Sequence, residues 1–259
     1  MIFVVSNDFT SSILRGNHIA QALGARLFFA DLGGVRNDTV VFVKEADRGL
    51  VEDAKERDNR VALDIIDFYC YPGRGCTFAD LVDVLIVPNK QCIEWYRPRF
   101  PNSEFAVIPH QWDYRIKGTA PQDYCRTAYI GKDFNQPECW GGPAITKSED
   151  FLQAAPMFNL HLALQSRDDM AWLLKPSTKI STASAVGACV VTYKDAGALE
   201  LLGWDYPFYV HEGMDVNEAI VYAQKTFGGP TWKRARERME EVKEKTSLEA
   251  VAKLYRELG

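Results

Sequence analysis

The residues with the clearest capacity for chemistry form the run Lys175-Pro176-Ser177-Thr178-Lys179. Pro176 suits the first turn of a helix, where its missing N–H is not needed, and the two hydroxyl residues can satisfy or extend the unpaired N–H groups there. The positive end of the helix dipole favours an anion, and the two lysines add cations about one turn apart. The run therefore predicts a phosphate-binding site. The alternative is an ordinary capped helix with two solvated lysines.

Short apolar runs alternate with helix-like stretches on both sides of this segment. We predict strands at residues 2–5, 25–30, 39–43, 61–66, 84–87 and 105–108, and again at 126–130, 158–164, 188–192 and 207–210. Apolar strands that alternate with helices indicate parallel sheets covered on both faces, hence an α/β fold with two Rossmann-like lobes. A stretch rich in Pro and Gly at 109–121 predicts the crossing, and we divide the chain into domains 1–117 and 118–259. Ligands of such sheets bind at the carboxyl ends of strands, so the active site is expected in the cleft between the lobes.

Composition is that of an ordinary globular protein, with 47% hydrophobic and 25% charged residues over 259 positions. The amino terminus is a poor signal peptide, and no stretch approaches the roughly 18 apolar residues of a membrane-spanning helix, so we expect a cytoplasmic protein. The six cysteines include no Cys-x-x-Cys pair and are expected to be free thiols. A net charge of −5 disfavours a protein that binds mainly to phosphate backbones of nucleic acids.

A resemblance to a known family rests on the same segment. The pattern Lys-Pro-Ser-Thr-Lys-Ile-x-x-Ala-x-Ala-x-Gly-x-x-Val-Val from Lys175, followed by Asp195-Ala-Gly-Ala-Leu-Glu200, resembles the donor-binding region of GT-B glycosyltransferases. In that family a helix with a basic residue near its start receives the diphosphate of a sugar nucleotide. Three segments of the amino half resemble the first loop and helix and the acceptor-side strand ends of the fold: residues 6–24, 87–89 and 107–110.

The chain also departs from the common retaining branch of this family. Two glutamates that bracket the motif there correspond to Leu174 and Thr182 here. The chain is shorter than two full GT-B lobes usually require, so its loops must be trimmed or one lobe reduced. The identity of the donor sugar and the stereochemical outcome therefore do not carry over from the resemblance.

Three residues of the amino half are candidates for catalysis. Asp8 follows the first predicted strand, where an inverting transferase would place a general base for the acceptor hydroxyl, although it could equally cap the following turn. Asp67 lies at the end of the predicted strand 61–66 and is favoured over Asp64 to face the cleft. His110 follows Pro109 at another strand end and titrates near neutrality, which suits proton transfer or a hydrogen bond at a hinge.

Other residues are candidates for binding the donor. Gly16 could let a loop backbone approach the donor phosphates, with Arg15 as a second cation. By the resemblance, Gly131 and Lys132 lie where GT-B proteins place a glycine turn beside the donor, and Glu200 corresponds to a carboxylate that accepts from ribose hydroxyls. The structural alternatives are that Lys132 is a solvated surface lysine and that Glu200 is a charge on a helix face.

The sequence thus predicts a glycosyltransferase that moves a sugar from a nucleoside-diphosphate sugar, expected to be a UDP-sugar, to an acceptor hydroxyl. No Asp-x-Asp pair follows a predicted strand, so we expect a site without a metal or other cofactor. The acceptor stays open among a glycan, a lipid-linked glycan, a small molecule, a protein and a modified DNA base. A sugar-nucleotide epimerase of similar fold and a noncatalytic nucleotide- or phosphosugar-binding module are the alternatives.

Overall fold

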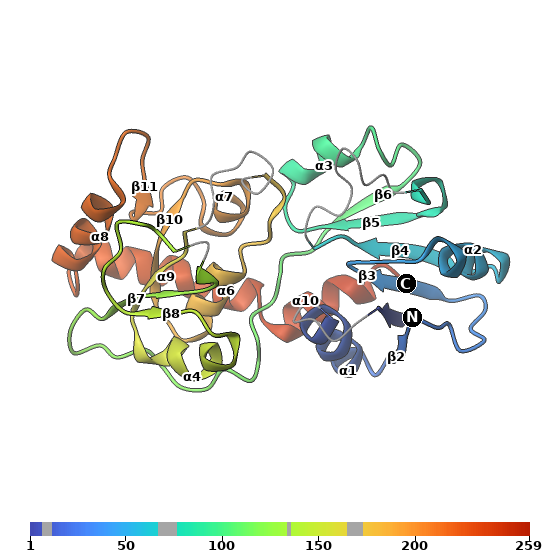
Figure 1. The fold of residues 1–259 in the computed structure, drawn as a ribbon, viewed down its shortest axis with the longest axis horizontal. Coiled ribbons are helices and arrows are strands. Elements are labelled where there is room, and N and C mark those ends of the chain that lie inside the picture. The colour runs from blue at the N-terminus through green and yellow to red at the C-terminus, as the bar shows by residue number, and fades with distance from the viewer. Residues whose placement is uncertain (7–11, 67–76, 134–135, 165–172) are drawn as a thin grey trace. The chain divides into compact units, whose positions relative to one another are not determined.

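The computed structural model describes residues 1–6, 12–66, 77–133, 136–164 and 173–259. The chain forms two compact units (Figure 1). Unit 1 comprises Met1–Gln111, Leu173–Pro176 and Leu248–Gly259, and unit 2 comprises Trp112–Trp172 and Ser177–Ser247. These units differ from the predicted limits 1–117 and 118–259 because the chain leaves unit 1 after Gln111 and its last helix returns there.

Unit 1 is built on a six-stranded sheet in the order β2-β1-β3-β4-β5-β6. Every neighbouring pair is parallel, and the apolar strands β1, β3 and β5 are buried along their whole length, as expected for a sheet covered on both faces. The strands are β1 (Ile2–Val5), β2 (Arg26–Phe29), β3 (Thr39–Val43), β4 (Arg60–Asp64), β5 (Val84–Val87) and β6 (Glu104–Val107). The helices are a π-helix (Ser12–His18), α1 (Ile19–Leu23), α2 (Arg48–Glu56), a 3₁₀ turn (Ala79–Leu81), α3 (Gln91–Tyr96) and α10 (Leu248–Arg256).

Helix α10 belongs to unit 1 although it is the last helix of the chain. Its apolar face buries Val251, Ala252 and Tyr255 in the same core as Phe3 of β1 and Ile19 of α1. Figure 1 shows α10 beside α1, and the two helices are in contact. Strand β1 and helix α10, which come from opposite ends of the sequence, therefore pack in the same core.

A buried ion pair lies at the centre of unit 1. Arg15 of the π-helix donates from Nε and Nη2 to the two oxygens of Asp64, at 2.8 and 3.2 Å, and both side chains are at most 3% exposed. The remaining Arg15 nitrogen, Nη1, donates to the carbonyl of Pro109 at 2.7 Å. Tyr255 of α10 donates its hydroxyl to the same carboxylate. The ion pair thus joins the end of β4, the π-helix, the segment after β6 and the last helix.

Electrostatics favours the charged pair and a neutral phenol in this network. Burial alone would lower the pKa of Arg15, but the adjacent Asp64 carboxylate outweighs it and raises that pKa above its ordinary value. Burial, reinforced by the Asp64 charge, raises the pKa of Tyr255 well above its ordinary value. The Tyr255 hydroxyl therefore keeps its proton and acts as a donor.

Unit 2 is built on a five-stranded sheet in the order β11-β10-β9-β7-β8, again with parallel pairs throughout. The strands are β7 (Thr127–Ile130), β8 (Ala144–Ile145), β9 (Leu160–Leu162), β10 (Cys189–Tyr193) and β11 (Tyr209–Val210). The α-helices are α4 (Phe151–Ala154), α6 (Thr178–Ala185), α7 (Ala196–Leu202), α8 (Val216–Lys225) and α9 (Pro230–Lys245), and two 3₁₀ turns cover Ser148–Asp150 and Ala155–Met157. Two parallel sheets with surrounding helices confirm the predicted α/β class.

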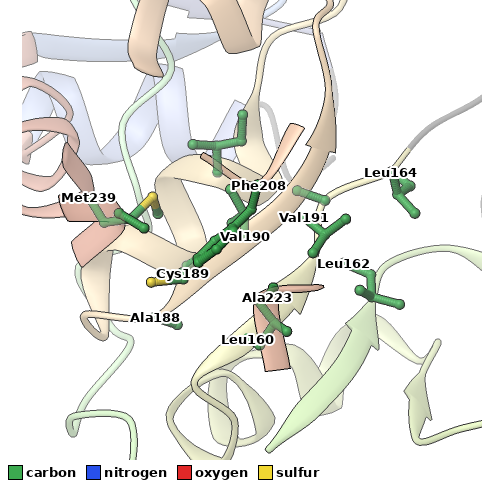
Figure 2. Close-up of a cluster of buried hydrophobic side chains, with 14 of the residues drawn as sticks. Leu160, Leu162, Leu164, Ala188, Cys189, Val190, Val191, Phe208, Ala223 and Met239 are labelled. Carbon is green, nitrogen blue, oxygen red and sulfur yellow. The ribbon is translucent and has the colours of Figure 1, made fainter. Parts of the chain in front are cut away.

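The core of unit 2 includes buried side chains of the central strand β9 and its neighbour β10. Side chains of β9 and β10, including Leu160, Leu162 and Val190, gather with Phe208 and with Met239 of α9 (Figure 2). His161 of β9 is also buried, and its Nε2 lies 3.0 Å from the carbonyl oxygen of Ala155. A carbonyl oxygen can only accept, so Nε2 carries the proton.

The predicted strands are present with shifts of a few residues at their ends, and residues 246–247 separate α9 from α10. The two-residue strand β8 and the short helix α4 were not predicted, because neither has an apolar run long enough to show a period. No helix in the described part of the chain is long and apolar enough to cross a membrane.

We predict that Asp64→Asn destabilises the protein by about 3 to 5 kcal/mol, because it leaves the Arg15 charge buried without its anionic partner. Tyr255→Phe should cost about 1.5 to 3 kcal/mol, the range for a hydrogen bond to a charged group. The free energy of unfolding from urea titration followed by circular dichroism measures both. The control is Glu52→Gln, which breaks the exposed Arg48–Glu52 pair and should change stability by less than about 0.5 kcal/mol. An equal, small effect of all three substitutions would contradict the central role of the network.

We predict that His161 makes the stability of the protein fall in mild acid. Burial lowers the pKa of His161 to about 4, whereas the unfolded chain titrates near 6.5. As the pH falls from about 6.5 to 4, the unfolded state binds a proton that the folded state does not, so stability is lost over this window, by roughly 3 kcal/mol in total.

The measurement is the free energy of unfolding at several pH values for the wild type and for His161→Gln, which keeps a donor but does not titrate. The difference in slope between the two proteins isolates the contribution of His161. Identical slopes in both proteins would show that His161 is not responsible.

Candidate functional site

The topology of unit 2 marks one edge of its sheet as a place for a ligand. From β7 the chain moves outward to β8, whereas from β9 it moves in the other direction to β10. The strand order therefore reverses between β7 and β9. In open α/β sheets ligands bind outside the carboxyl ends of the strands at this switch point. The segments that follow β7 and β9 are thus the first place to examine.

Gly131 follows β7 at this switch point, and its lack of a side chain is required by its neighbours. A Cβ atom there would lie 2.7 Å from Lys179 Cε and 2.7 Å from the Tyr129 hydroxyl oxygen. Contacts under 3.0 Å essentially never occur for a real Cβ, so a larger residue would force these groups to move. The Gly131 N–H donates to the carbonyl of Ile145 at 3.0 Å, which fixes the turn against β8.

Lys179 reaches from the first turn of α6 to the same place. Its Nζ donates to the Tyr129 hydroxyl at 3.1 Å and to the carbonyl of Leu164, just after β9. The ammonium also lies 4.5 Å from the centroid of the Tyr129 ring, within the range of a cation–π interaction. Lys179 therefore places a positive charge between the ends of β7 and β9.

Tyr129 is the residue of β7 that holds this arrangement together. Its side chain is fully buried, and its hydroxyl donates to the carbonyl of Lys132 at 2.6 Å, which closes the turn that contains Gly131. Burial, with a smaller contribution from the Asp133 charge, raises the pKa of Tyr129 to about 12. The phenol is therefore neutral near pH 7 and keeps the proton that it donates.

Helix α6 begins at Thr178, with Ser177 as its N-cap residue. Within the described chain, the Ser177 side chain makes no capping hydrogen bond, so it leaves the first N–H groups of α6 to other partners. Gly187 has a φ of +70° and follows the end of the helix, a conformation that glycine adopts without strain. The start of α6 thus has the character of an anion-binding helix terminus.

The sequence prediction for the residues just before α6 was wrong in one respect. Pro176 precedes the N-cap and does not lie in the first turn, and Lys175 lies in a bend before it. Lys175 and Lys179 therefore do not share a helix face one turn apart. Lys175 is half-buried and belongs to unit 1, whereas Ser177, Thr178 and Lys179 belong to unit 2.

Glu200 lies on α7, the helix that follows β10. This helix is capped by Asp195, whose side chain accepts from the N–H of Ala198 at 2.7 Å. Glu200 is half-buried on the second turn. Its assignment as an acceptor for ribose hydroxyls stays a prediction from the resemblance.

Arg15 and Gly16 are both buried in unit 1. The Arg15 guanidinium is engaged with Asp64 and backbone carbonyls, so binding a phosphate would require this network to open. A Cβ at Gly16 would lie 2.6 Å from Val5 Cγ1, which shows that the glycine permits close packing of the π-helix on β1. The predicted contacts of both residues with donor phosphates stay predictions.

The three candidates for catalysis all belong to unit 1. Asp8 and Asp67 lie in the segments 7–11 and 67–76, outside the described residues. His110 is buried, with its Nδ1 3.0 Å from the carbonyl oxygen of Gln111, at the point where the chain leaves unit 1. Gln111 anchors the same segment by donating from its side chain to the carbonyl of Leu14. Both alternatives for His110, proton transfer and a hydrogen bond at a hinge, stay predictions.

Two groups that contact Lys179 were not predicted from the sequence. Tyr129 lies inside an apolar strand, where an aromatic residue is ordinary, and the Leu164 carbonyl has no signal in residue type. The predicted strand 158–164 ended at Leu164, which could have pointed to this segment. In the described residues no group of three or more His, Cys, Asp or Glu side chains is arranged to hold a metal ion.

No protein-family model and no curated protein matches the chain. Solved structures resemble it over nearly the whole length of both chains. A glycosyltransferase from Rickettsia africae ESF-5 aligns with a TM-score of 0.70 at 10% identity, covering 99% of this chain and 97% of that chain. Anabaena Alr3699/HepE in complex with UDP-glucose aligns with a TM-score of 0.65 at 10% identity, covering 99% and 98%. AviGT4, a glycosyltransferase involved in avilamycin A biosynthesis, aligns with a TM-score of 0.61 at 12% identity, covering 99% and 96%.

At these identities the likeness concerns the fold. The two parallel sheets of this chain correspond to the two Rossmann-like lobes of GT-B glycosyltransferases. The chain therefore has the GT-B fold that the sequence resemblance predicted.

Proposed function

We propose that the chain is a glycosyltransferase that moves a sugar from a UDP-sugar to an acceptor hydroxyl. The observation that carries the proposal is the position of the Lys179 ammonium, beside Gly131 at the switch point of unit 2. Similar structures support the donor class, since Anabaena Alr3699/HepE was solved with UDP and with UDP-glucose and pneumococcal GtfA with UDP and GlcNAc.

The chemistry of transfer requires positive charge where the diphosphate leaves. When the bond between the sugar and the diphosphate breaks, negative charge develops on the departing phosphate oxygens. The Lys179 ammonium and the N-terminus of α6 lie on the same edge of the sheet and can stabilise that charge. Because residue 131 is a glycine, the backbone after β7 can approach the donor diphosphate closely.

The same arrangement supports transfer without a metal ion. A divalent cation in such reactions would neutralise the diphosphate, and a lysine held at the switch point can supply part of that charge. We assign removal of the acceptor proton to Asp8, which follows β1 in the sequence, with Asp67 and His110 as alternatives. A retaining reaction would need none of the three as a base. The acceptor is a hydroxyl of a molecule that remains to be identified.

The experiment that tests the function starts with a thermal-shift screen of UDP-, GDP- and ADP-sugars, with and without EDTA. A donor that binds the folded state raises the melting temperature, and we expect UDP-sugars to do so with EDTA present. The selected donor is then incubated with candidate acceptors, and release of UDP is measured. A rearranged sugar without acceptor would instead identify an epimerase, and binding without turnover would identify a noncatalytic module.

We predict that Lys179→Met weakens UDP binding by roughly 10- to 150-fold, because a hydrogen bond to a charged group contributes about 1.5 to 3 kcal/mol. Isothermal titration calorimetry measures the dissociation constant. Lys225→Met is the matched control, since Lys225 is an exposed lysine in the last turn of α8 in the same unit. Near-wild-type affinity of the Lys179 variant would show that Lys179 does not bind the donor phosphates.

We predict that Gly131→Ala weakens UDP binding by roughly 5- to 150-fold. The added methyl group displaces the Lys179 stem or the Tyr129 hydroxyl, and overpacking of this kind costs about 1 to 3 kcal/mol. The same titration is made on Gly141→Ala, where a Cβ meets nothing within 4 Å. If both glycine variants bind UDP equally well, close approach at Gly131 has no part in donor binding.

A further inference from the structure

We propose that Tyr129 is a positioning residue for the donor diphosphate, acting by fixing the Lys179 ammonium and the Gly131–Lys132 turn relative to each other. The inference rests on the proposed function and goes beyond it, because it assigns a role to a strand residue that need not touch the substrate. Its test is arranged so that the two can fail separately.

The geometry gives the Tyr129 hydroxyl two distinct partners. It donates its hydrogen to the Lys132 carbonyl at 2.6 Å, and it accepts from Lys179 Nζ at 3.1 Å. A hydroxyl has one hydrogen and two lone pairs, so the first bond turns the lone pairs away from Lys132 and makes them available to the ammonium. The turn after β7 and the cation from α6 are thus linked through one oxygen atom.

The ring of Tyr129 adds a second constraint on the same cation. Lys179 Nζ lies 4.5 Å from the ring centroid, and the ring itself is fully buried and cannot move aside without disturbing the core. A lysine side chain has four rotatable bonds and loses considerable freedom when it is held in one place. Because Tyr129 and the Leu164 carbonyl already hold the ammonium, this ordering precedes the arrival of a ligand.

The neutral state of the phenol suits this role. Burial keeps the pKa of Tyr129 at about 12, so over the neutral range the residue offers a dipole and no negative charge. A carboxylate at the same place would form a strong ion pair with Lys179 and would repel the phosphates of a donor. A phenol orients the ammonium and leaves its positive charge to act on the diphosphate.

A phosphate-free ligand separates positioning from general structural damage. Uridine shares the base and ribose of UDP but lacks the diphosphate, so Lys179 should contribute to the binding of UDP and not to that of uridine. We expect Tyr129→Phe to weaken UDP binding by about 5- to 30-fold and to leave uridine binding within twofold of the wild type. Both ligands are titrated calorimetrically into the full chain, after circular dichroism has shown that the variant is folded.

Tyr206→Phe is the matched control. Tyr206 is a buried tyrosine of the same unit whose hydroxyl donates to the carbonyl of Val190 and accepts from its N–H, both at 2.9 Å. The loss of this phenol should lower stability without changing the ratio of UDP to uridine affinity. A double variant of Tyr129→Phe with Lys179→Met should bind UDP no more weakly than Lys179→Met alone, because the tyrosine acts through the lysine.

Each outcome decides between the possibilities. The wild type is titrated first, and if it does not bind UDP, both the proposed function and the role of Tyr129 fall. If the wild type binds UDP and Tyr129→Phe binds it equally well, the function stands and the positioning role is refuted. An equal loss of UDP and uridine affinity, or an additive double variant, would also refute positioning, since either result means that Tyr129 does not act through Lys179.

Discussion

The buried pair between Arg15 and Asp64 is the interaction on which unit 1 depends. Two ions removed from water are tolerated when they are close and their remaining hydrogen-bonding groups are satisfied. Here the guanidinium uses the carboxylate and backbone carbonyls, and the carboxylate also accepts from Tyr255. Because the tyrosine lies 191 residues from Asp64 in sequence, the return of α10 to unit 1 is part of what makes the pair possible.

Lys179 in unit 2 is held by different kinds of partner from Arg15 in unit 1, and this difference suits the two cations to different roles. The Arg15 charge is neutralised at once by a carboxylate in a bidentate contact, which favours permanence. Two of the contacts of the Lys179 ammonium are instead with a hydroxyl and a carbonyl, which are neutral dipoles. Such contacts orient a cation while leaving its field to act on a phosphate. The first cation is therefore suited to a core and the second to a site.

The sequence predicted the parallel sheets, because strand ends and helix starts are local features, whereas the assignment of Gly131, Lys132 and Lys179 to one donor site came from the resemblance to GT-B proteins. It did not predict that Arg15 would be buried, because an arginine beside a glycine looks the same in the sequence whether the pair lies in a loop or in a core. The partners that decide the matter, Asp64 and Tyr255, come from distant parts of the chain. The exact start of α6 was also beyond local propensity, which assigns helix ends only to within a few residues.

The first five strands of unit 1 have the same order as the five strands of unit 2, and this repetition limits where a donor can lie. In unit 1 the order reverses between β1 and β3, and in unit 2 between β7 and β9. At the first reversal the Arg15 charge is already matched by Asp64, whereas at the second a lysine meets a glycine turn and a helix N-terminus. A diphosphate needs positive charge at the strand ends, and the second reversal combines a lysine with a glycine turn and a helix N-terminus, so its chemistry fits the donor.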